Sequence, residues 1–165
     1  MKRIILTVLI ITFFLVYSEN TEAKAKKSPN FALYNMKGKL VTLSKLKKQG
    51  NFILSFWASY CVPCKKEIPQ IVELEKKYGK KKNFKLVLVN INKEGKEKAK
   101  PVLKQLGVTN ECLLDIYQIT AKKFIPKLKI PAVFLITKKG NIVFDAIGES
   151  EKNIQNLKKA ILKLK

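Results

Sequence analysis

The stretch NFILSFWASYCVPC, residues 51–64, joins an apolar segment directly to two cysteines. Residues 51–57 are almost continuously apolar, which is typical of a central strand buried on both faces. From Cys61 to about residue 78 the apolar residues recur at helical spacing, so a helix is predicted to begin at the first cysteine. Cys61 and Cys64 are therefore predicted to lie at the junction of a buried strand and a helix.

This junction suits thiol–disulfide exchange. The attacking group in that reaction is a thiolate, which a helix N-terminus favours through unpaired N–H groups and the positive end of the helix dipole. Two intervening residues let the second sulfur reach the first within one turn, and Pro63 suits the first turn because its missing N–H is not needed there. We predict that Cys61 is the exposed attacking thiol and Cys64 the resolving thiol. A purely structural disulfide is the alternative.

The flanking sequence predicts an α/β fold with a mixed central sheet flanked by helices. Short strands are expected at 31–33 and 40–43, with a turn at Lys37-Gly38 and Ser44 as the cap of a helical turn. Cys112 falls in a further apolar segment and is expected to be a buried bystander. The other predicted strands are 84–89, 132–137 and 141–147, and the other predicted helices are 96–106, 116–124 and 150–165.

The N-terminus has the layout of an export signal. Lys2 and Arg3 precede an apolar run at residues 4–17, and polar residues follow it. We divide the chain into residues 1–25, a signal peptide or an N-terminal membrane anchor, and residues 26–165, one folded domain expected to be monomeric. Both interpretations predict an extracytoplasmic location, in the periplasm or at the outer face of the cytoplasmic membrane, where disulfides are exchanged.

Composition excludes several functions. The formal net charge is +22, but arginine occurs only at Arg3, so the bidentate arginine contacts of sequence-specific DNA readers are not available and no nucleic-acid partner is expected. A preference for anionic lipid or for acidic partners stays open. Histidine is absent, which excludes histidine-based catalysis and zinc sites that need imidazole.

Residues 56–67, FWASYCVPCKKE, resemble the active-site segment of the TlpA/ResA family of thioredoxin-like proteins. Residues 29–33, Gly38-Lys39 and residues 43–47 resemble that family's N-terminal β-hairpin, and residues 130–136, IPAVFLI, its cis-proline strand. The resemblance implies a thioredoxin-like fold with an N-terminal β-hairpin extension. It also implies an extracytoplasmic reductant of protein disulfides, in several members serving cytochrome c maturation, that an upstream membrane thiol reductant recharges.

The resemblance also implies how the site is built. The redox group would be the Cys61–Cys64 disulfide, with no other cofactor and no metal. Ile130-Pro131 is expected to be a cis peptide that faces the cysteines, so that the Ile130 backbone can pair with an extended client segment. The residues expected to contact the client are Trp57, Tyr60, Pro63, Ile130 and Pro131.

Glu67 is predicted to transfer a proton at this site. A helix places it one turn after Cys64, and a carboxylate held partly away from water could accept the proton of the resolving thiol. Ser55 stands where thioredoxin itself has a buried acid, and its hydroxyl is too weak a base for this role. The alternative is a solvated Glu67 that pairs with Lys66.

The thioredoxin-like fold also supports other functions. A peroxiredoxin needs Thr or Ser three residues before its reactive cysteine, where this chain has Ala58, and an arginine, which is missing after Arg3. A disulfide oxidase or isomerase stays open because dipeptides between the cysteines tune the potential widely, so the direction of electron flow is inferred. A non-enzymatic thiol-based haem or metal-binding module is the remaining alternative.

Overall fold

Strand β3, Asn51–Trp57, forms the centre of the sheet, and every one of its residues is buried. In the computed structural model, which describes residues 26–164, the seven strands lie in the order β2-β1-β5-β4-β3-β6-β7. β3 pairs in parallel with β4 and antiparallel with β6, so the mixed central sheet is confirmed. The other strands are β1 Ala32–Asn35, β2 Leu40–Thr42, β4 Phe84–Asn90, β5 Glu111–Leu114, β6 Ala132–Ile136 and β7 Ile142–Ile147.

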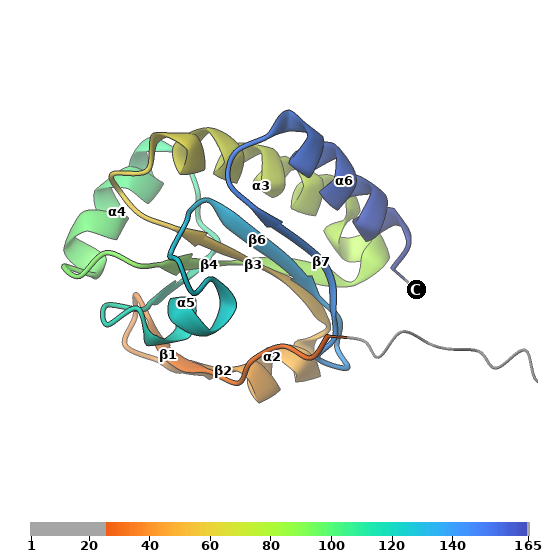
Figure 1. Cartoon of the computed structure of the whole chain (residues 1–165), viewed down its shortest axis with the longest axis horizontal. Coiled ribbons are helices and arrows are strands. Elements are labelled where there is room, and N and C mark those ends of the chain that lie inside the picture. The colour runs from red at the N-terminus through yellow and green to blue at the C-terminus, as the bar shows by residue number, and fades with distance from the viewer. Residues whose placement is uncertain (1–25, 165) are drawn as a thin grey trace, which may run out of the picture.

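The helices cover both faces of this sheet (Figure 1). α3, Val62–Lys82, and α4, Lys96–Gln105, connect parallel neighbours by crossovers in one direction, and α6, Glu151–Leu162, packs against α3 on the same face. α2, Leu43–Gln49, and α5, Ile119–Phe124, lie on the other face. There Phe124 of α5 packs against Phe56 and Phe134, with ring centroids 5.2 and 5.1 Å away, and closes the second half of the core.

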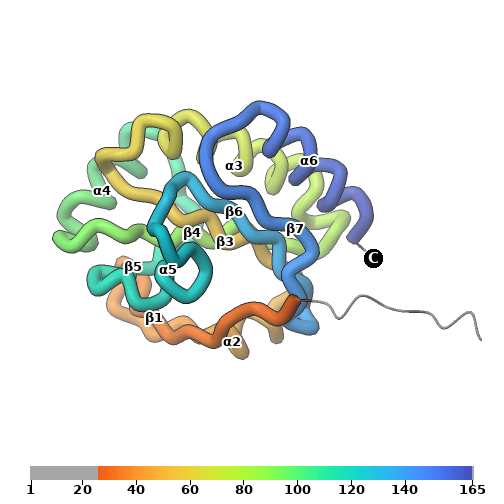
Figure 2. The backbone as a smooth tube through the Cα atoms, viewed as in Figure 1, coloured from red at the N-terminus to blue at the C-terminus, as the bar shows by residue number. Residues whose placement is uncertain are grey.

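Different segments of the chain lie at the two ends of the sheet (Figure 2). The parallel strands β3, β4 and β5 all finish at one end, where α3 begins. The first described residues and the end of α6 lie at the opposite end. The carboxyl ends of parallel strands are where α/β sheets place reactive groups, and the cysteines lie at this end.

Three predicted boundaries need correction. Thr42, not Ser44, caps α2, because its Oγ1 accepts a hydrogen bond from the Lys45 N–H at 3.2 Å. α5 begins at Ile119 rather than at residue 116, because Gln118 has the left-handed conformation that precedes the helix. α3 continues past residue 78 to Lys82, and Gly79 packs so closely that a Cβ there would lie 3.0 Å from the Phe84 carbonyl oxygen.

The β1–β2 pair confirms the N-terminal hairpin, with Leu33 opposite Val41. Within residues 26–164 no helix has both the length and the apolar character to cross a membrane. The predicted export segment at residues 4–17, and the boundary at residue 25, lie outside the described residues.

Candidate active site

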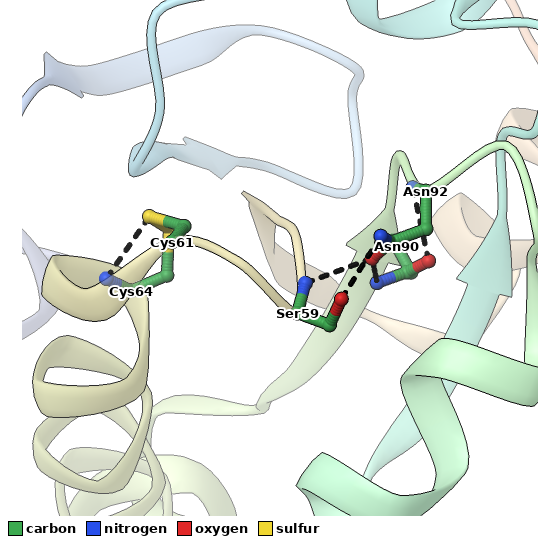
Figure 3. Close-up of a disulfide and its surroundings, with 5 residues drawn as sticks. All are labelled: Ser59, Cys61, Cys64, Asn90 and Asn92. Carbon is green, nitrogen blue, oxygen red and sulfur yellow. Dashed lines mark hydrogen bonds between the residues drawn. A yellow bond between two sulfur atoms is a disulfide. The ribbon is translucent and has the colours of Figure 1, made fainter.

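Cys61 and Cys64 form a disulfide at the N-terminus of α3, with their Cα atoms 5.3 Å apart. Cys61 is the N-cap residue, and its Sγ accepts a hydrogen bond from the Cys64 N–H at 3.2 Å (Figure 3). The Cys61 N–H in turn donates to the Ala58 carbonyl at 3.0 Å, which turns the chain from β3 into the helix. The predicted strand-to-helix junction is confirmed, and a helix N–H that has no carbonyl partner within the helix donates to the first sulfur.

The two cysteines differ in access to water. Cys61 is 7% exposed, whereas Cys64 is completely buried. The expected order is confirmed, but the expectation of an openly exposed Cys61 is wrong for this oxidised state, in which the residue is buried. A client disulfide would meet Cys61 first and could not reach Cys64.

Two asparagines that sequence reasoning missed hold the turn before Cys61. The Asn92 side chain accepts from the Ser59 N–H at 2.8 Å and donates to the Ser59 Oγ at 3.0 Å. Asn90 donates to the same Asn92 Oδ1 at 3.0 Å, as Figure 3 shows. Both asparagines are buried, at and just after the end of β4. In the sequence they are two polar residues at and just after the end of an apolar segment. Their role could not be predicted without knowing that β4 pairs with β3.

Glu67 is buried on α3, one turn after Cys64. Its side chain is 5% exposed, and its Oε2 has no hydrogen-bond partner among the described residues. Burial, with a smaller contribution from the negative charge of Glu149, raises the pKa of Glu67 from 4.5 to about 7. The alternative of a solvated Glu67 paired with Lys66 is therefore wrong, and the proton-transfer role stays a prediction.

The Ile130–Pro131 peptide bond is cis, as expected. Pro131 is buried immediately before β6, and its carbonyl accepts from the Gly148 N–H at 2.7 Å. Because Ala132 pairs with Phe56, this peptide lies at the same end of the sheet as the turn that leads to Cys61. Contact between Ile130 and a client stays a prediction.

The predicted client contacts around the cysteines divide into surface and core residues. Tyr60 is 67% exposed beside Cys61, and Pro63 is partly buried. Trp57 is completely buried, so assigning it as a client contact is wrong for this structure. Trp57 is the last residue of β3, and it packs in the core directly before the turn that leads to Cys61. Sequence reasoning did not identify Tyr117 and Ile119, which are exposed at the start of α5.

Two further buried groups lie in the sheet. Ser55 is 1% exposed and its Oγ has no hydrogen-bond partner among the described residues. Cys112 lies in β5, as predicted, and is free. Burial raises the pKa of the Cys112 thiol to about 12, while the adjacent Trp57 and the Asn90 backbone act weakly in the opposite direction. At neutral pH this sulfur is a thiol, which is a poor nucleophile.

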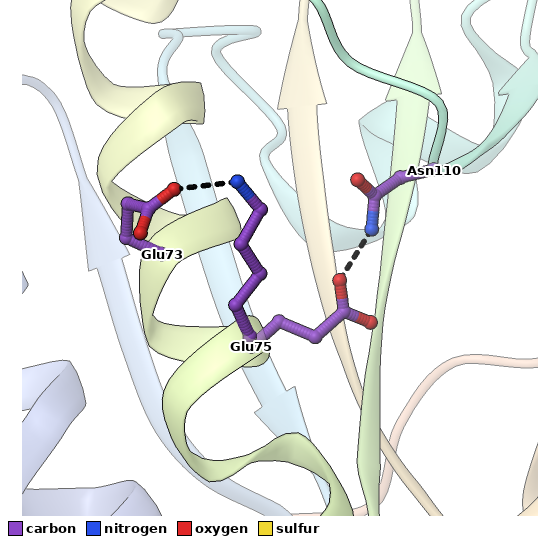
Figure 4. Close-up of polar contacts among 4 residues, drawn as sticks. Glu73, Glu75 and Asn110 are labelled. Carbon is purple, nitrogen blue, oxygen red and sulfur yellow. Dashed lines mark hydrogen bonds and ion pairs between the residues drawn. The ribbon is translucent and has the colours of Figure 1, made fainter.

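Glu75 fixes the middle of α3 against the sheet (Figure 4). Its carboxylate accepts from the Leu86 N–H at 2.6 Å and from the Asn110 side chain, so the helix that carries the cysteines is tied to β4 and to the segment before β5. The neighbouring Glu73 instead pairs with Lys76 on the exposed face, at 2.7 Å. An exposed pair of this kind contributes little to stability.

Comparison with known proteins gives consistent matches. The family model described as Redoxin matches residues 23–161. The thiol-disulfide oxidoreductase ResA of Bacillus thuringiensis (strain Al Hakam) is 34% identical over 130 residues, which cover 77% of this chain and 71% of that protein. ResA of Bacillus subtilis (strain 168) is 33% identical over 128 residues, covering 73% of this chain and 65% of that protein.

Solved structures resemble the whole described domain. A Chlorobium tepidum protein assigned as the thiol:disulfide interchange protein DsbE is 30% identical, with a TM-score of 0.74 over 84% of this chain and 95% of that one. A thiol-disulfide oxidoreductase from Bacteroides fragilis is 25% identical, with a TM-score of 0.68 over 81% of this chain and 98% of that one. The thioredoxin-like fold expected from the resemblance is confirmed.

Proposed function

The chain belongs to the redoxin family, among the ResA-type thiol–disulfide oxidoreductases, and from this premise we propose that it reduces disulfides in client proteins outside the cytoplasm. The observation that carries the proposal is the unequal burial of the two cysteines at the start of α3. One sulfur can meet a partner disulfide, and the other can react only with the first.

The reaction begins with the reduced pair. The Cys61 thiolate attacks one sulfur of the client disulfide, forming a mixed disulfide and releasing the other client sulfur as a thiolate that takes up a proton. The Cys64 thiol then loses its proton and attacks the Cys61 Sγ. This forms the Cys61–Cys64 disulfide and releases the second client thiol, so two electrons pass to the client. A dithiol reductant must then restore the pair, and we propose a membrane thiol reductant for this step.

Helix geometry supports the role of Cys61. The Cys64 N–H that donates to Cys61 Sγ would stabilise a thiolate at that position, together with the positive end of the α3 dipole. Cys64 lies inside the first turn and is fully buried, where a free thiolate is less favourable. The resolving thiol therefore needs a base at the moment it attacks.

Glu67 is our candidate for that base. It lies three residues after Cys64 on the same helix, and its pKa of about 7 matches a group that gains and loses protons near neutrality. As a carboxylate it would take the Cys64 proton, and its negative charge before that step would disfavour both thiolates. The buried, unpartnered Oε2 supports this role because no structural contact of that atom accounts for its position.

Client recognition would use the exposed surroundings of Cys61. The Ile130 backbone makes no backbone hydrogen bond within the described part of the chain, and it lies at the end of the sheet that carries the cysteines. An extended client segment could pair with it as an added strand. Tyr60 would then pack against client side chains, with 67% of its surface free.

The location and the clients extend the proposal. We place the domain outside the cytoplasm, secreted or anchored by residues 4–17, because the N-terminal sequence has the layout of an export segment. Cytochrome c maturation is the proposed process, since the resemblance of residues 56–67 points to that group of reductants.

Trapping of the mixed disulfide tests the division of roles. Cys64→Ser, prepared reduced, is expected to accumulate a covalent complex with a protein disulfide substrate, because Cys61 can attack but nothing resolves the product. Cys61→Ser is the matched control and should form no such complex. The complexes are read by non-reducing electrophoresis and mass spectrometry. Equal trapping by the two variants would contradict the assignment of Cys61 as the attacking thiol.

A further inference from the structure

Charge is divided unequally between the two ends of the molecule. Five segments meet at the end opposite the cysteines: residues 26–28, 47–51, 79–85, 137–142 and 156–164, here called the basic end. They contain thirteen lysines and no aspartate or glutamate. The loops and the first two turns of helices at the other end carry six of the ten acidic side chains within residues 26–164, namely Glu67, Glu94, Glu97, Asp115, Glu149 and Glu151.

Contacts between the segments show that they form one surface. The Ser28 N–H donates to the Gly140 carbonyl at 2.9 Å, which holds the first described residues against the β6–β7 turn. The side chain of Lys47 lies against the same glycine. Lys82 reaches from the end of α3 to the Leu164 carbonyl at 2.8 Å. The Asn51 N–H donates to the Asn83 carbonyl at 3.0 Å, which joins the two groups of segments. The five segments therefore lie side by side, although they come from distant parts of the sequence.

Helix dipoles explain only part of this charge. Lys47, Lys48, Lys159 and the run 80–82 lie in last turns of helices, where cations are favourable. Lys26, Lys27, Lys85, Lys138 and Lys139 lie outside helices, and all five are exposed. Helix dipoles therefore do not account for the lysines of the β6–β7 turn or for those of the N-terminal segment at residues 26–28.

A groove of about 620 Å³ lies within the basic end, between the β6–β7 turn and α6. Its floor includes the apolar side chains of Val143, Ala160 and Leu164, and lysines line the same groove at 138, 139, 159 and 163. Cations around an apolar floor match an anionic amphiphile, whose charged head meets the lysines while its apolar part meets the floor.

We propose that the basic end is a docking surface for a bilayer that contains anionic lipid. A bilayer is favoured over a compact acidic ligand because only four of the thirteen lysines line the groove and the other nine spread over the rest of the basic end. The predicted export segment ends at residue 17, nine residues before Lys26, so a chain that keeps it holds the basic end within roughly 30 Å of the bilayer. Docking in this way leaves the start of α3, which carries Cys61, at the end of the sheet away from the lipid.

Lysine acetylation footprinting of the full chain tests this proposal. The chain is reconstituted in phosphatidylcholine vesicles with or without about one third phosphatidylglycerol, and the reactivity of each lysine is read by mass spectrometry. We expect acetylation of Lys81, Lys159 and Lys163 to slow several-fold in the anionic vesicles only, with Lys93, Lys96 and Lys98 unchanged. Equal reactivity in the two kinds of vesicle, or equal slowing at both ends, would overturn the proposal.

Two variants separate charge from anchoring by residues 1–25. K26Q/K27Q/K138Q/K139Q removes four charges that cap no helix, so folding should be retained, and K93Q/K96Q/K98Q/K152Q removes four at the opposite end. Each lysine near an anionic surface strengthens attraction about fivefold, so the first variant should lose the slowing and the second should keep it. If soluble glycerol phosphate protects the same lysines as well as vesicles do, the surface binds free anions and the membrane proposal fails.

Discussion

Glu67 is a carboxyl group that the fold holds away from water, and its titration should be visible in the stability of the domain. Its pKa rises from 4.5 to about 7 on folding, so between these values the folded state keeps a proton that the unfolded chain has lost. The stabilisation that this proton provides is complete below about pH 4.5 and is lost as the pH rises through 7. At about 1.4 kcal/mol per pKa unit, the full effect is about 3 kcal/mol.

Glu67→Gln is predicted to remove this dependence. In urea denaturation of the oxidised protein, the variant should exceed the parent in free energy of unfolding by up to about 3 kcal/mol at pH 8, with the difference shrinking towards pH 5. In the reduced protein, loss of the negative charge should lower the pKa values of the two thiols, read as alkylation rate against pH. Glu73→Gln, on the exposed face of α3, is the control. Parallel stability curves and unchanged thiol titration would make Glu67 a passive residue.

Cys112 illustrates the opposite case, a thiol that burial makes inactive. With its pKa raised to about 12, it should not react with a thiol reagent in the native reduced protein, whereas Cys61 should react quickly. Cys112→Ala is predicted to keep reductase activity close to that of the parent. Thiol counting before and after denaturation checks the first point. A folded variant that retains under a tenth of the activity would show that Cys112 takes part.

At the scale of elements, the end of β4 positions the turn that carries the site. Asn92→Ala would leave the partly buried Ser59 N–H without its acceptor, which costs about 1 kcal/mol, and should also slow client reduction because the turn before Cys61 loosens. Ser59→Ala removes only the Oγ contact and should cost less. Denaturation and reduction kinetics of both variants check this order. Equal losses in the two would mean that the backbone contact is not what fixes the turn.

The spacing of apolar residues predicted the strands and helices well wherever neighbouring residues alone determine the structure. The buried run at 51–57 and the helical spacing after Cys61 identified β3 and α3, and spacing along α3 identified Glu67. Which strands pair with one another in the sheet could not be predicted from the local spacing of residues. The roles of Asn90 and Asn92 depend on β4 lying beside β3, and the burial of Trp57 depends on covering layers from distant segments.

At the scale of the whole molecule, the fold gathers at one end lysines that are spread evenly along the sequence. Lysine occurs throughout the chain, so its distribution along the sequence did not indicate which surface of the fold would be basic. The fold brings acid-free segments together at one end and places the disulfide at the other. The molecule therefore has a reactive end and a basic end, and the proposed redox and membrane functions can be tested separately.

The reduction potential of the Cys61–Cys64 couple is the most direct test of the proposal that this domain passes electrons to its clients. Equilibration of the full chain with glutathione or dithiothreitol buffers at pH 7, read by alkylation and mass spectrometry, gives the value. A client reductant should lie nearer to thioredoxin, at about −270 mV, so we expect a potential below about −220 mV. A potential near −120 mV, as in a strong disulfide oxidant, would contradict it.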